Sequence, residues 1–105
     1  MAKQMIYMAK NIKAEEAYRI GLVNAVYPQE ELMGAARKMA ECIAGNAPIA
    51  VRNCKKAINE GLQVDMDQAL VIEEHLFGTC FETHDQKEGM GAFLEKRKEK
   101  HFINR

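Results

Sequence analysis

Tryptophan is absent from these 105 residues and proline occurs only twice, so few positions interrupt a helix. The formal net charge is zero, which leaves no global field to attract nucleic acid or an anionic membrane. No apolar run approaches the ~20 residues that a transmembrane helix needs. These absences argue against nucleic-acid and membrane partners. Ala, Met, Leu, Glu and Lys are abundant instead, and because these are good helix formers we expect an all-α chain.

Cysteine is also scarce, with only Cys42, Cys54 and Cys80. An odd number without paired spacing argues against a disulfide framework, and the lack of a C-x-x-C motif argues against zinc. We therefore expect each cysteine to be a small buried hydrophobe in a helix. Residues 1–5 lack the charged-then-apolar layout of a signal peptide, and the expected location is the cytoplasm.

Apolar residues recur at helical spacing along most of the chain. We predict one helical domain over residues 1–105. The predicted helices span residues 2–8, 14–20, 29–45, 49–60, 66–81 and 84–93.

Residues that favour helix ends support these boundaries. Gly21 is placed to end the second helix in the left-handed conformation, and Pro48 suits the first turn of the fourth. Asp65 and Thr83, each followed three residues later by Gln, form the pattern of a capping box at the last two helices. Lys13 precedes the second helix and cannot accept an N-cap hydrogen bond, which predicts a looser start there.

No catalytic constellation is visible in the residues themselves. Residues 73–75 (Glu-Glu-His) are helix neighbours that point to different faces, and no metal-ligand spacing occurs. We expect His84 and His101 to be exposed, without a catalytic role. Residues 89–91 (Gly-Met-Gly) follow no strand and are no phosphate loop. The basic run 96–98 is flanked by Glu95 and Glu99, which favours a solvated tail over nucleic-acid binding.

Several segments, in order, resemble the enoyl-CoA hydratase/isomerase (crotonase) family. They are AEEAYRIGLVNAV (residues 14–26), IAGNAPIAVR (43–52), KKAIN (55–59), EEHLF (73–77), DQKEGM (85–90) and AFLEKR (92–97). The chain looks most like the short-chain crotonases, the bacterial 3-hydroxybutyryl-CoA dehydratases. The resemblance implies the C-terminal helical region of the crotonase fold, without its spiral of ββα turns.

The resemblance also implies where the chemistry lies. The two catalytic glutamates and the backbone amides that polarise the thioester belong to the spiral, so we expect them upstream of Met1 and expect these 105 residues alone to be inactive. Phe77 and Lys96 match positions that reach the adenine and ribose-phosphate end of CoA. Core packing of Phe77 and simple solvation of Lys96 are the open alternatives.

The implied parent reversibly hydrates a short-chain 2-enoyl-CoA, crotonyl-CoA to 3-hydroxybutyryl-CoA. It needs no metal or redox cofactor, because CoA is part of the substrate. We expect the parent to be a homotrimer or hexamer, and the 105 residues alone to form a dimer or larger oligomer. Two alternatives stay open: an isomerase of the same family, and a helical self-association module that has no enzymatic role.

Overall fold

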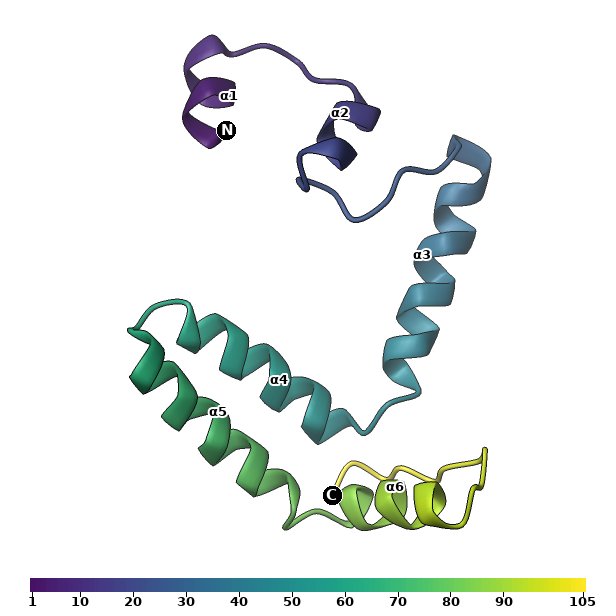
Figure 1. The fold of residues 1–105 in the computed structure, drawn as a ribbon. Coiled ribbons are helices and arrows are strands. Elements are labelled where there is room, and N and C mark those ends of the chain that lie inside the picture. Colours follow the sequence, from purple (N-terminus) through teal and green to yellow (C-terminus); the bar gives the residue numbers. More distant parts are fainter. The chain divides into compact units, whose positions relative to one another are not determined.

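The computed structural model describes all 105 residues, and every regular element in it is a helix (Figure 1). In chain order the helices are α1 (Ala2–Met8), α2 (Ala14–Arg19), α3 (Gln29–Ala44), α4 (Pro48–Gly61), α5 (Met66–Cys80) and α6 (His84–Leu94). The predicted ranges differ from these bounds by one residue at most, and the all-α expectation is confirmed. The chain forms two compact units, Met1–Met39 and Ala40–Arg105. The single domain predicted for residues 1–105 stays a prediction.

The first unit shows how a glycine ends a short helix. Gly21 closes α2 with φ at +74°, the left-handed conformation that the sequence predicts. The N–H of Gly21 donates to the carbonyl of Tyr18 at 3.0 Å, and that of Leu22 to the carbonyl of Ala17 at 2.8 Å. This is the Schellman arrangement, which satisfies the last carbonyls of the helix. At the other end, Lys13 makes no capping side-chain bond, as expected.

In the second unit, α4 and α5 lie side by side as a helical hairpin (Figure 1). Pro48 is the first residue of α4, where its missing N–H costs no helical hydrogen bond. Asp65 caps α5 by accepting a hydrogen bond from the N–H of Gln68 at 3.0 Å. The helices approach closely near their connection: a Cβ added to Gly61 would lie only 3.4 Å from the Cβ of Ala69. Small residues therefore set the spacing of the hairpin.

Helix α6 and the segment after it form the last part of the unit. Thr83 caps α6 by accepting a hydrogen bond from the N–H of Gln86 at 3.1 Å. The C-terminal segment then turns back along the helix (Figure 1), with the N–H of Asp85 donating to the carbonyl of Arg105 at 3.2 Å. The ring of Phe102 lies beside Gly89, where a Cβ would be 3.6 Å from its Cε1. The returning segment thus covers one face of α6.

Few apolar side chains are buried within these residues. The buried apolar residues are Ala17 in the first unit and Leu76 and Ala92 in the second, while α3 and α4 contain no buried residue. The expectation of buried cysteines is wrong for Cys42 and Cys54, which are exposed, whereas Cys80 is half-buried. The reason is that helical periodicity marks an apolar face without supplying the surface that covers it. No helix has both the length and the apolar character needed to cross a membrane.

Candidate functional site

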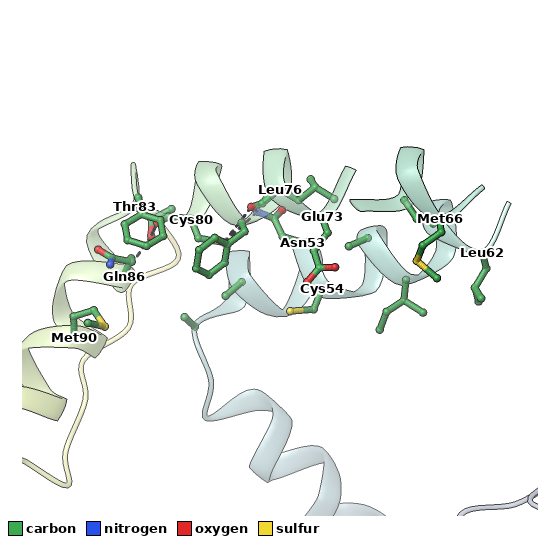
Figure 2. Close-up of a pocket in the computed structure, with 18 residues that line it drawn as sticks. Asn53, Cys54, Leu62, Met66, Glu73, Leu76, Cys80, Thr83, Gln86 and Met90 are labelled. Atoms are coloured by element: carbon green, nitrogen blue, oxygen red, sulfur yellow. Dashed lines mark hydrogen bonds between the residues drawn. The ribbon is translucent and has the colours of Figure 1, made fainter. Parts of the chain in front are cut away.

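A groove lies between α4, α5 and the first turns of α6, and we call it the helical groove (Figure 2). Its volume is about 790 Å³ and its lining is mostly apolar. In Figure 2 it extends from Leu62 and Met66, near the α4–α5 connection, to Gln86 and Met90 on α6. The remaining lining residues include alanines of α4 and α5, Ile58, Leu76, Phe77 and Phe81. A groove of this kind can take an apolar partner surface or part of a ligand.

The polar groups of the groove hold its two long helices together. The amide of Asn53, on α4, donates to the carbonyl of Leu76 at 3.0 Å and to Oγ1 of Thr79 at 2.9 Å, and approaches Sγ of Cys80 at 3.4 Å. All three partners lie in the last part of α5. The NH2 group of Asn53 therefore joins α4 to α5, and its role in the groove is structural.

Phe77 lines the helical groove and is 65% exposed. Its ring meets that of Phe81, the C-cap residue of α5, edge to face, with centroids 5.1 Å apart and planes at 76°. Such a pair restrains the ring without covering it. Within these residues Phe77 is consequently not packed into a core, which leaves it available to a partner or a ligand.

Lys96 lies in a tight turn that directly follows α6, and we call residues 95–99 the Lys96 turn. Lys96 has φ at +56°, the left-handed conformation that usually belongs to glycine. Its N–H donates to the carbonyl of Phe93 at 3.2 Å, and that of Arg97 to the carbonyl of Ala92 at 2.8 Å. The Schellman arrangement seen at Gly21 is thus repeated here around a lysine. Lys96 is exposed and forms no ion pair.

Phe77 and Lys96 are not brought into one cavity. Phe77 belongs to the helical groove, whereas Lys96 lies beyond the end of α6 and does not line it. The assignment of both residues to the nucleotide end of CoA stays a prediction. Both residues are exposed in the structure. The ring of Phe77 packs against that of Phe81, and the backbone of Lys96 is fixed by the hydrogen bonds of its turn.

Arg97, the cation next to Lys96 in this turn, is fully occupied. The guanidinium of Arg97 bonds the carboxylate of Glu88 through two nitrogens, at 3.0 and 3.2 Å. It also bonds the Glu95 carboxylate at 2.6 Å and the Glu99 carbonyl at 3.1 Å. The bond from Arg97, helped by the N–H of His101 at 3.0 Å, lowers the pKa of Glu88 from 4.5 to about 2. The same carboxylates raise the pKa of Arg97.

Asp85 is a buried carboxylate whose position the sequence does not reveal. It is 1% exposed, and its two oxygens accept the N–H groups of Ile103 at 2.7 Å and Asn104 at 2.9 Å. Burial alone would raise the pKa of Asp85, but these two donors and nearby His84 outweigh burial and lower it. Asp85 therefore fastens the returning C-terminal segment to the start of α6. Its partners lie 18 and 19 residues away, and no local pattern points to them.

No group of three or more His, Cys, Asp or Glu side chains could hold a metal ion. Residues 73–75 are exposed on α5, and the side chain of His84 is 53% exposed. His101 is exposed as well. The features that remain for function are the helical groove, the ring of Phe77 and the ammonium of Lys96.

Comparison with known proteins gives concordant results. The family model for enoyl-CoA hydratase/isomerase matches residues 1–103. The chain is 56% identical over 105 residues to a short-chain-enoyl-CoA hydratase of Clostridium acetobutylicum, and 56% identical over 98 residues to a crotonyl-CoA hydratase of Syntrophomonas wolfei. It spans 40% and 38% of the lengths of these two proteins. A crystal structure of an enoyl-CoA hydratase from Bacillus anthracis superimposes with a TM-score of 0.94 at 41% identity, covering 99% of this chain and 40% of that one.

Proposed function

Because the chain belongs to the enoyl-CoA hydratase/isomerase family, we propose that it forms the C-terminal helical region of an enzyme that reversibly hydrates short-chain 2-enoyl-CoA thioesters. The proposed pair is crotonyl-CoA and 3-hydroxybutyryl-CoA. The observation that supports this best is the 56% identity, along the whole chain, to a protein named short-chain-enoyl-CoA hydratase. A second relative, of the same identity, is named crotonyl-CoA hydratase.

The proposed role of these residues is to cover the substrate and to build the oligomer. The exposed apolar side chains of the helical groove support it, since Leu62, Met66 and Phe77 are 77%, 72% and 65% exposed. Apolar surfaces of this extent are usually covered by another part of a protein. We propose that the rest of the enzyme and neighbouring subunits cover them in a homotrimer or hexamer located in the cytoplasm.

Phe77 and Lys96 are the proposed contacts to the nucleotide end of CoA. An exposed ring held by an aromatic neighbour can stack on adenine, since both are flat and weakly hydrated on their faces. An ammonium that has no carboxylate partner can pair with a phosphate. Adjacent Arg97 is neutralised by Glu88 and Glu95, whereas Lys96 has no carboxylate partner and is available to a phosphate.

The chemical step itself is assigned to other parts of the enzyme. Adding water across a conjugated double bond needs an acid–base pair and donors that polarise the thioester carbonyl. We propose that both arrangements lie in other parts of the enzyme, and that the reaction uses no metal or redox cofactor, since CoA is part of the substrate. On this proposal the 105 residues alone do not turn over crotonyl-CoA.

Hydration assays of two proteins test the assignment of the reaction. The purified 105-residue chain and the longer enzyme that contains it are each mixed with crotonyl-CoA, and the ultraviolet absorbance of the conjugated thioester is followed. We expect the longer enzyme to consume crotonyl-CoA and form 3-hydroxybutyryl-CoA, and the short chain to match buffer. Turnover by the short chain that survives repurification would contradict the assignment of the chemical step to other parts of the enzyme. A shifted double bond without added water would favour the isomerase.

Kinetics of point variants test the two contact residues. In the longer enzyme, Phe77→Ala and Lys96→Ala should raise KM for crotonyl-CoA more than they lower kcat, because the contacts are remote from the reacting atoms. Lys98→Ala removes a lysine two positions away and serves as the matched control, and it should leave KM unchanged. If both test variants kept the parental KM, the assignment of these residues would be wrong.

One observation favours a second candidate function. The helical groove is open and apolar, which also suits a self-association module that has no enzymatic role. An inactive longer protein that still assembled into oligomers would support this candidate.

A further inference from the structure

The strongest unexplained feature of the second unit is the way in which one side chain organises the Lys96 turn. Arg97 bonds Oε2 of Glu95, the residue before Lys96, at 2.6 Å and the carbonyl of Glu99, the last residue of the turn, at 3.1 Å. Its other bonds go to both oxygens of Glu88, at 3.0 and 3.2 Å. The chain from Glu95 to Glu99 therefore folds around a single guanidinium.

The backbone of Lys96 needs such support. A residue with a Cβ is disfavoured in the left-handed conformation that Lys96 adopts at φ +56°. The Schellman bonds from the N–H groups of Lys96 and Arg97 close the turn on the side of the helix. The Arg97 side chain adds bonds to the Glu95 carboxylate and the Glu99 carbonyl, so both neighbours of Lys96 are restrained.

The restraint is anchored in α6 itself. Glu88 lies within α6 and is largely covered, its side chain being 16% exposed. Besides Arg97, its carboxylate accepts the N–H of His101 at 3.0 Å, which fixes the chain after the turn. The turn is thus held to a rigid helix at both of its ends. A flexible lysine gains most as a ligand contact when its backbone is fixed in advance, because less freedom is lost on binding.

We propose that Arg97, held by Glu88, is a positioning residue for substrate binding: it fixes the Lys96 turn so that the Lys96 ammonium is presented to a phosphate of the CoA nucleotide. This inference rests on the proposed function of Lys96. Arg97 acts through Lys96 and does not itself touch the substrate, since its nitrogens are engaged by carboxylates and a carbonyl. Lysine at position 97 would keep the charge and lose the planar fork that bonds three partners at once.

The test uses Arg97→Lys in the longer enzyme with two substrates. One is crotonyl-CoA, and the other is crotonyl-pantetheine, which has the same reacting group without the nucleotide. Arg97→Lys and Lys96→Ala should each raise KM for crotonyl-CoA by roughly three- to tenfold, the range of a partly exposed charge-assisted contact. Neither should change kcat, and neither should change KM for crotonyl-pantetheine. Arg19→Lys, which alters another Arg–Glu pair far along the chain, is the matched control and should change nothing.

A double variant separates positioning from independent effects. If Arg97 acts through Lys96, Arg97→Lys should add little to KM in the Lys96→Ala background. Glu88→Gln keeps the shape of the partner side chain and should raise KM for crotonyl-CoA as Arg97→Lys does. It provides the test if the Arg97→Lys protein folds poorly.

The outcomes distinguish this inference from the proposed function. An unchanged KM for Lys96→Ala would overturn the proposed contact itself. A raised KM for Lys96→Ala with parental values for both Arg97→Lys and Glu88→Gln would overturn the positioning role alone. An equal rise in KM for crotonyl-pantetheine would also overturn it, because such a rise indicates a general disturbance of the fold that does not depend on the nucleotide. Fully additive effects on KM in the double variant would overturn it as well, because Arg97 would then act independently of Lys96.

Discussion

Replacing Lys96 by glycine should move stability and substrate binding in opposite directions. Lys96 holds a left-handed φ of +56° at the end of α6, where glycine has no Cβ penalty. The penalty for a residue with a side chain is about 1–2 kcal/mol. Glycine gives back part of that gain, about 0.4–1 kcal/mol, because it makes the unfolded chain more flexible. We expect Lys96→Gly to raise the free energy of unfolding by about 0.5–1 kcal/mol.

Lys96→Ala is the matched variant, since alanine removes the ammonium and keeps the Cβ. It should leave stability within about 0.5 kcal/mol of the parent. Both variants should show the same rise in KM for crotonyl-CoA, because both lack the cation. Urea unfolding of the longer enzyme measures the first quantity, and steady-state kinetics measure the second.

Two results would refute this reasoning. If Lys96→Gly were no more stable than Lys96→Ala, the left-handed turn would not strain the lysine. If glycine gave a clearly larger KM than alanine, backbone flexibility rather than the lost ammonium would dominate binding.

Three further predictions concern packing, pH and association. Asn53→Ala should lower the free energy of unfolding by about 1–3 kcal/mol in urea, since it removes the link between α4 and α5, whereas exposed Asn59→Ala should be neutral. The pKa of Glu88 is depressed from 4.5 to about 2, so its stabilising effect is complete above pH 4.5 and is lost as the pH falls toward 2. When the free energy of unfolding is measured between pH 4.5 and 2, it should fall less for Glu88→Gln than for the parent. In sedimentation at micromolar concentration the 105-residue chain should be a dimer or larger, because burying a side chain such as Leu62 is worth about 1–2 kcal/mol. A folded monomer with a sharp thermal transition would contradict the last prediction.

The helices could be predicted from the sequence because their signals are local. Asp65 and Thr83 cap the helices that follow them through the N–H three residues later, and Gly21 ends α2 in the left-handed conformation. Only the first half of each expected capping box forms, with no reciprocal bond from the glutamine side chain. The resemblance to the family also depends only on the sequence, and the family model that matches residues 1–103 confirms it.

What only the tertiary structure decided involves partners far apart in the chain. Cys54 lines the apolar groove, yet both it and Cys42 are exposed, because burial depends on a covering surface that periodicity does not supply. Asp85 is buried because a returning segment brings the N–H groups of Ile103 and Asn104 to it. Lys96 and Arg97 are adjacent basic residues in the sequence, but one is free and the other is neutralised, since only Arg97 reaches the carboxylate of Glu88. The identity of a side chain is local, whereas its charge environment is set by how the chain folds back on itself.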